Sequence, residues 1–232
     1  MNRISCISFF LPVLVWAAAI GQPAAADDLK QNLDLPFDAG GADLEEESGT
    51  NLITFYGQQY EGDGVFYCLD RSSSMKDQGE LDILKREVLR NLLEFAQAVQ
   101  FGIVFFSSDT VKFPDTGLPV EATSGMKGSA QAFLNCINAG GATCAARGLM
   151  EALRMANAST AKRSMILFLT DGNLYCRGME SEAYKAKTLE DVTRGNYKQV
   201  PIHCIAIGGD VDVEFLLQLS RANNGTYRQI NR

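Results

Sequence analysis

The sequence predicts an α/β protein with a Rossmann-like, doubly wound, mostly parallel sheet, one antiparallel edge strand and helices on both faces. Short apolar runs alternate along the chain with longer segments in which apolar residues recur every three or four positions. Strands separated by such helical segments form parallel sheets that helices cover on both sides. Two of the apolar runs end at an aspartate, CLD at Asp70 and LTD at Asp171. Strands that end in this way place carboxylates at the ligand-binding edge of the sheet.

The predicted elements begin at residue 64 and follow one another in regular order. The strands are buried apolar and aromatic runs, expected at 64–69, 101–106, 110–113, 164–170, 202–207 and 225–230. The helices are expected at 80–99, 129–137, 144–156, within 181–194 and at 213–222. The first helix is the clearest, because Leu81, Leu84 and Val88 begin a series spaced by three and four positions. Residues 110–113 should pair with the preceding strand as the antiparallel edge.

Two segments precede this domain, which we expect to span residues 51–232. Residues 1–26 combine a positive start, an apolar stretch at 7–20 and three alanines before an aspartate, the pattern of a cleaved secretory signal. The apolar stretch is shorter than the ~18–20 residues that cross a bilayer, although an uncleaved anchor is the alternative. Residues 27–50 are acidic and lack an apolar period, which predicts a flexible arm or linker. We therefore expect a secreted or periplasmic protein with no membrane span after signal cleavage.

Composition excludes several classes of function. The chain has 21 Lys and Arg against 28 Asp and Glu, a formal net charge of −7. Without a long basic run, this acidity argues against nucleic acid or an anionic membrane as the main partner. A single histidine, His203, removes most metal-hydrolase and catalytic-triad arrangements. Because His203 lies in an apolar strand, we expect a hydrogen-bonded core residue and not a ligand.

The cysteines divide into two groups. Cys68 and Cys204 fall within predicted strands, where buried and inert thiols are expected. Cys136, Cys144 and Cys176 fall in loops or at helix ends. Two of these three could form a disulfide in an oxidising compartment and stiffen the surrounding loops. Sequence alone leaves the pairing open.

Oxygen-bearing side chains gather where the predicted strands end. If the strands that end at Asp70 and Asp171 are neighbours at the switch point of the sheet, their carboxylates converge on one crevice. Ser72 and Ser74 follow the first strand, and Thr143 lies in a GGAT loop before a helix. Two carboxylates and three hydroxyls form a hard, all-oxygen site that favours Mg²⁺, with Ca²⁺ or Mn²⁺ as further candidates. Such an ion keeps an exchangeable position that an external carboxylate can fill.

The motifs that carry these residues, DRSSS, GGAT and LTDG, resemble the three segments of a von Willebrand factor type A (VWA) domain. In that family the segments form the metal-ion-dependent adhesion site, or MIDAS. The resemblance implies that Ser72, Ser74 and Thr143 contact the ion directly. It also implies that Asp70 and Asp171 act directly or through water.

The chain departs from the family pattern in three respects. Ser73 stands where the family usually has glycine between the two serines. Arg71 brings a cation beside the site, which could weaken metal binding or help to hold an acidic ligand. The chain ends soon after the last predicted strand, so the closing helix common in the family is missing or very short. That would leave part of one sheet face under-covered.

Three functions remain after these exclusions. The favoured one is a secreted, metal-dependent protein-binding module for adhesion or assembly, whose partner supplies an Asp or Glu to the ion. The second is a metal-independent structural or assembly scaffold of the same fold, whose helical faces do the binding. Asp70 and Asp171 could then simply cap helices. The third is a phosphotransferase with Asp70 as nucleophile, but haloacid-dehalogenase-like sites need a second Asp where Ser72 stands. No P-loop, HExxH or GxSxG motif is present either, so we expect no enzymatic activity.

Overall fold

A computed structural model describes residues 51–209 and 211–230. The predicted signal at 1–26 and the arm at 27–50 lie outside the described residues. The strands are β1 Leu52–Phe55, β2 Gln58–Glu61, β3 Gly64–Asp70, β4 Gln100–Phe106, β5 Thr110–Phe113, β6 Val120–Glu121, β7 Ser164–Thr170, β8 Ile202–Ile207 and β9 Tyr227–Ile230. The helices are the 3₁₀ turn η1 Ser74–Gly79 and α1 Glu80–Glu94, α2 Ser124–Asn135, α3 Ala145–Ala158, α4 Ser181–Gly195 and α5 Val213–Ala222.

The main sheet has the predicted doubly wound topology. Its strands lie in the order β5-β4-β3-β7-β8-β9, and β6 pairs with the start of β4. β3, β4, β7, β8 and β9 run parallel to one another. β5 is antiparallel to β4, which confirms the expected edge hairpin, and the short β6 is a second antiparallel strand. The α/β fold class is therefore confirmed.

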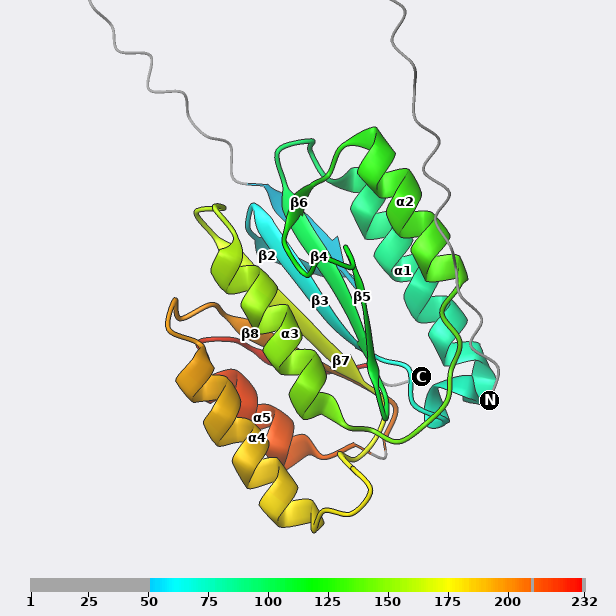
Figure 1. Ribbon diagram of the computed structural model, residues 1–232, viewed down its shortest axis with the longest axis vertical. Coiled ribbons are helices and arrows are strands. Elements are labelled where there is room, and N and C mark those ends of the chain that lie inside the picture. Colours follow the sequence, from blue (N-terminus) through cyan, green and yellow to red (C-terminus); the bar gives the residue numbers. More distant parts are fainter. Residues whose placement is uncertain (1–50, 210, 231–232) are drawn as a thin grey trace, which may run out of the picture. The chain divides into compact units, whose positions relative to one another are not determined.

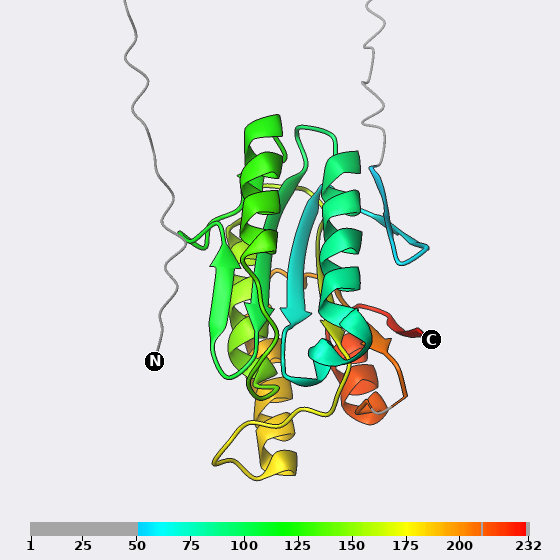
Figure 2. The ribbon, with the colours of Figure 1, turned by 90° about the vertical axis from the view of Figure 1, so that its right-hand side faces the viewer.

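Helices cover both faces of the sheet, as Figures 1 and 2 show. α1 and α2 lie on one face, and α3, α4 and α5 lie on the other. Successive side chains of β3 point to opposite faces of the sheet, so the strand contributes to the core on both sides. Val65, Tyr67 and Leu69 pack toward α1, while Phe66 and Cys68 pack toward α3. All five side chains are buried, because a central parallel strand has helices on both sides.

A hairpin that the sequence analysis did not identify covers the remainder of the α1 face. β1 and β2 pair antiparallel as a separate two-stranded sheet, seen in blue beside α1 in Figure 2. Phe55 and Tyr60 are buried in the same core cluster as α1. The Tyr60 ring lies 4.8 Å from the ring of His203 on β8, and Arg228 on β9 donates to the carbonyl of Tyr56. The hairpin thus adds cover to the face of the sheet on which α1 lies.

Several predicted boundaries differ from the observed ones. The first helix was expected to reach residue 99 but ends at Glu94, because Phe95 turns into an extended conformation. α2 begins five residues earlier than expected, at Ser124, because the Thr123 side chain accepts from the amide of Met126 and caps the helix. β9 begins at Tyr227 and not at 225. Within 51–209 and 211–230, no helix is long and apolar enough to cross a membrane.

Candidate functional site

The two predicted carboxylates lie where the strand order reverses. The chain runs from β3 to β4 on one side and later returns to β7 on the other, so β3 and β7 flank the switch point. β3 ends at Asp70, and β7 ends at Thr170, directly before Asp171. The expected adjacency of these strands is confirmed, and their carboxyl ends form the floor of the site.

Asp70 is fully buried and held from two sides. Its Oδ1 accepts from the Ser72 amide at 2.7 Å, and its Oδ2 accepts from the Thr170 hydroxyl at 2.6 Å. Burial raises the pKa of Asp70 to about 7, against the lowering effect of these hydrogen bonds. Sequence reasoning missed Thr170, although it stands inside the LTD motif. A carboxylate in this environment gains most from a nearby positive charge.

Ser72, whose amide donates to Asp70, connects through two hydroxyls to Asp171. The Ser72 and Ser74 oxygens lie 3.0 Å apart, and Ser74 donates to Asp171 Oδ1 at 2.9 Å. Burial also raises the pKa of Asp171, while the hydrogen bond from Ser74 lowers it. Thr143 lines the same hollow of about 450 Å³ as Ser74 and Asp171. All five predicted residues therefore gather at one end of the sheet.

Backbone contacts join the DRSSS and GGAT loops. The amide and hydroxyl of Ser73 both donate to the Gly141 carbonyl at 3.1 Å, and Gly140 donates to the Arg71 carbonyl at 2.8 Å. Ser73, in the position where glycine is usual, thus adds a bond between the loops. Gly141 has a φ of 93°, and a Cβ there would lie 2.9 Å from the Ser108 hydroxyl. Only glycine fits this position without strain.

Arg71 does not direct its charge at the carboxylates. Its guanidinium pairs with Asp109 at 2.5 Å and donates to the carbonyl of Asn138 at 3.2 Å. Asp109, which follows β4, also accepts from the Ser107 hydroxyl at 3.0 Å. The sequence analysis noted that the positive charge of Arg71 could oppose a metal ion. Asp109 compensates that charge, so the opposition is smaller than the sequence alone suggests. Asp109 was not identified in advance.

Thr143 is fixed by a backbone bridge and a disulfide. Its amide donates to the Tyr175 carbonyl at 2.9 Å, and the Tyr175 amide donates back at 3.2 Å. The next residues, Cys144 and Cys176, form a disulfide with a Cα–Cα distance of 4.7 Å. This resolves part of the pairing that the sequence left open. Cys68 and Cys204 are buried free thiols, as expected.

The donor set fits a hard divalent cation. Carboxylate and hydroxyl oxygens suit Mg²⁺, Ca²⁺ or Mn²⁺ better than softer metals. Asp77 and Glu80 also line the hollow and add negative potential. Over the described part of the chain, no group of three or more His, Cys, Asp or Glu side chains is arranged to hold a metal. An ion here would therefore depend on the three hydroxyls as well as on Asp70 and Asp171.

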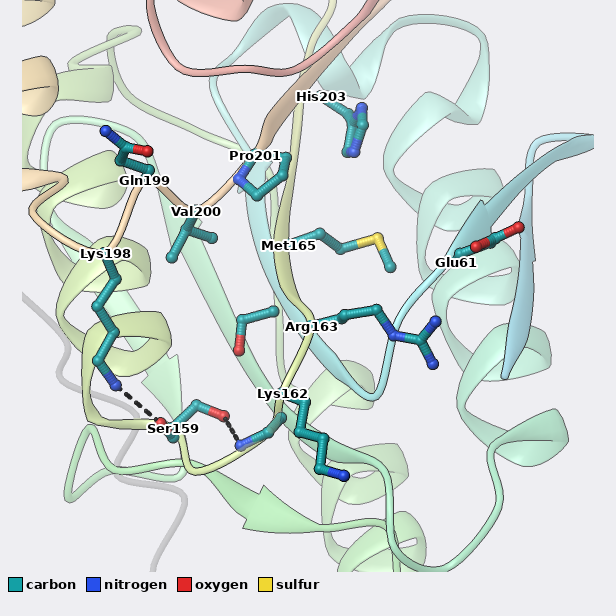
Figure 3. A pocket seen from close by; sticks show the side chains of 12 residues that line it. Glu61, Ser159, Lys162, Arg163, Met165, Lys198, Gln199, Val200, Pro201 and His203 are labelled. Carbon is teal, nitrogen blue, oxygen red and sulfur yellow. Dashed lines mark hydrogen bonds between the residues drawn. The ribbon is translucent and has the colours of Figure 1, made fainter. Parts of the chain in front are cut away.

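A second hollow, of about 400 Å³, lies at the opposite end of the sheet, where β7 and β8 begin. Figure 3 shows Lys162 and Lys198 on either side of Ser159, with Met165 among the other side chains that line the hollow. His203 lines it, and its Nδ1 lies 2.9 Å from the Thr226 hydroxyl. Burial lowers the pKa of His203 to about 4, so the ring is neutral at pH 7. The ring is half-buried and hydrogen-bonded, in keeping with a structural residue.

Comparison with known proteins identifies relatives of this chain. The family model for the von Willebrand factor type A domain matches residues 65–229. Inter-alpha-trypsin inhibitor heavy chain H1 of Bos taurus is 27% identical over 173 residues, covering 72% of this chain and 18% of that protein. The counterpart from Sus scrofa is 25% identical over the same coverage. The chain thus corresponds to less than a fifth of the length of these relatives.

Solved structures share the fold at low sequence identity. The von Willebrand factor type A protein from Catenulispora acidiphila has a TM-score of 0.63 and 20% identity, covering 73% of this chain and 38% of that one. Proximal thread matrix protein 1 from the mussel byssus, with a zinc-occupied MIDAS motif, has a TM-score of 0.52 and 18% identity, covering 78% and 45%. Because the family model matches well over half of its residues, this chain belongs to the von Willebrand factor type A domain family.

Proposed function

We propose that this protein is a metal-dependent protein-binding module for adhesion or assembly. Asp70, Ser72, Ser74, Thr143 and Asp171 would hold one divalent cation, with Mg²⁺ as the first choice. The partner would supply an Asp or Glu side chain. The observation that carries the proposal is the hydrogen-bonded series from buried Asp70 through both serines to Asp171.

The charge balance of the residues supports this proposal. The three hydroxyls are neutral, so only Asp70 and Asp171 offset the charge of a divalent ion directly. A bound ion of this kind supplies an electrophilic position for an external carboxylate. The hollow is open to solvent beside Ser74 and Asp171, which leaves access for a partner. The mussel byssus protein with a zinc-occupied MIDAS motif provides a precedent in the same fold.

Each residue has a distinct part in this proposal. Asp70 would contribute negative charge to the ion and, because it is fully buried, would not reach the partner. Ser72 and Ser74 would present hydroxyl oxygens, and Thr143, which lines the same hollow as Ser74, would present a third. Thr170 fixes one oxygen of Asp70 and so determines which oxygen faces the serines. Asp109 balances Arg71 and keeps that cation away from the ion.

The proposal predicts strong dependence of metal binding on Asp70. Isothermal titration of metal-stripped protein with Mg²⁺ should show one site, and Asp70→Ala should weaken binding by about 100-fold or more. Thr143→Ala should also weaken it, because it removes a neutral ligand. Asp82→Ala is the matched control, since Asp82 is an exposed acid on α1 and should leave the affinity unchanged. Wild-type protein that binds none of Mg²⁺, Ca²⁺ and Mn²⁺ would contradict the proposal.

The phosphotransferase alternative has less support. Both oxygens of Asp70 accept hydrogen bonds inside the protein, and the side chain is fully buried. A nucleophile must reach its substrate, and the Asp70 side chain has no exposed surface. We further propose that residues 1–26 are a cleaved signal, that residues 27–50 link it to the domain at 51–232, and that the protein acts outside the cytoplasm.

A further inference from the structure

Thr143 differs from the other proposed ligands in how it is placed. The side-chain hydrogen bonds at the site join Asp70, Ser72, Ser74 and Asp171 to one another. None of these contacts includes Thr143, so its position depends on its backbone. One side of that backbone is anchored to the loop after β4, where the next amide, of Cys144, donates to the Ser107 carbonyl at 3.2 Å.

The other side of Thr143 is anchored to the loop after β7. The two hydrogen bonds between Thr143 and Tyr175 form one rung, and the Cys144–Cys176 disulfide forms the next. Apart from this bridge, the loop from residue 171 to residue 180 contains neither a helix nor a strand. The disulfide is therefore the covalent connection that keeps the bridge in register.

We propose that this pair of rungs is a clamp that positions Thr143 as a metal ligand, so that the metal affinity of the site depends on the redox state of Cys144 and Cys176. Two electrons and two protons from a dithiol convert the disulfide to two thiols, and the dithiol closes into its own disulfide. Without the disulfide, the loop that follows β7 is free to separate from Thr143. The inference rests on the proposed function, because it concerns the same ion.

The clamp would act on a bound ion only through Thr143, and this indirect role determines the expected effect. Groups that orient a metal ligand without touching the metal typically change affinity by about 10–100-fold. We therefore expect Cys144→Ser with Cys176→Ser to weaken Mg²⁺ binding about tenfold. Dithiothreitol should lower the affinity of wild-type protein to the same level without any substitution. Tyr197→Ala removes an exposed tyrosine ring outside the clamp and should leave the affinity unchanged.

A double-mutant cycle separates positioning from general loosening of the fold. Removal of the disulfide should weaken Mg²⁺ binding in the wild-type background and have little further effect in Thr143→Ala. An equal loss in both backgrounds, or no loss in either, would overturn the clamp. Oxidised wild-type protein that fails to bind Mg²⁺ would instead overturn the proposed function. Unfolding measured in EDTA verifies that each variant is folded before titration.

Discussion

The two ends of the sheet have hollows of similar size but opposite character. The carboxyl end holds about 450 Å³ lined by Asp77, Glu80 and Asp171, and the amino end holds about 400 Å³ lined by Lys162, Arg163 and Lys198. At the carboxyl end, three loops are joined by hydrogen bonds and a disulfide. At the amino end, Lys198 donates to the Ser159 carbonyl and the cationic side chains lie on the exposed rim.

This difference supports the carboxyl end as the proposed binding site, because its polar groups come from separate loops that bond to one another. A hollow whose donors bond to one another is already organised before a ligand arrives, and it loses less entropy on binding. The parallel direction of the strands explains why the hydrogen-bonded loops gather at the carboxyl end of the sheet. Parallel strands deliver the loops after β3 and β7 to the same crevice at the switch point.

The largest expected effect is a contrast in the pH dependence of stability between Asp70 at the carboxyl end and His203 at the amino end. The folded-state pKa of Asp70 is about 7, above its usual value of 3.8, so without metal the folded state binds more protons than the unfolded state between pH 4 and 7. Its contribution to the free energy of unfolding should fall by roughly 3–4 kcal/mol as pH rises through that window. His203 has a lowered pKa of about 4, so its contribution should rise with pH between 4 and 6.5.

Denaturant unfolding in EDTA at pH 4.5 and pH 7 tests this contrast. Asp70→Asn should remove the falling contribution, and the variant should then gain stability relative to wild type as pH rises. His203→Gln should have the opposite effect, because it removes the rising contribution. Equal pH profiles for wild type and Asp70→Asn would contradict the contrast.

A glycine substitution tests how tightly the carboxyl end is built. Gly141→Ala should destabilise the fold by about 2–3 kcal/mol, because an alanine at a φ of 93° is strained and its Cβ meets the Ser108 hydroxyl. Gly57→Ala is the matched control. Gly57 also has a positive φ, of 75°, but nothing lies within 4 Å of its Cβ position. Thermal unfolding should show the smaller loss at Gly57, and equal losses would mean that the Ser108 contact is unimportant.

The smallest effect is expected at the rim of the amino-end hollow. Lys198→Ala removes the hydrogen bond to the Ser159 carbonyl and should change the free energy of unfolding by no more than about 0.5 kcal/mol. Mg²⁺ affinity should not change, because the two hollows lie at opposite ends of the sheet. A loss of Mg²⁺ binding in this variant would show that the two ends are coupled. Titration and unfolding of the same preparation provide both measurements.

The buried strands were the most predictable part of the fold. The runs at 164–170 and 202–207 were predicted with their observed bounds, because a mostly apolar run has few alternatives in a covered sheet. The half-buried edge strand at 110–113 was also predicted with its observed bounds. α2 was harder to place, since Gly125 and Gly128 weaken its first turns and the cap at Thr123 decides where it begins. Hairpin β1–β2 was missed because it is short and β2 is mostly polar and exposed.

The five proposed ligands could be identified from sequence because each stands at a strand end or a loop with a distinctive motif. Their supports could not be identified in the same way. The Thr170 contact with Asp70 joins residues that are 100 positions apart in the sequence. The Arg71 contact with Asp109 depends on the register in which β3 pairs with β4. The bridge between Thr143 and Tyr175 brings together loops that share no sequence signal. Such contacts arise from the register of neighbouring strands.

The hairpin β1–β2 has a practical consequence for where the chain can be cut. The family match begins at residue 65, but Phe55 is fully buried and the Asn91 side chain donates to the Thr54 carbonyl at 2.9 Å. A recombinant fragment that starts at Gly62 would expose the apolar surface beneath Phe55 and leave Asn91 without that acceptor. Such a fragment should aggregate or express poorly, whereas one that starts at Asn51 keeps the hairpin.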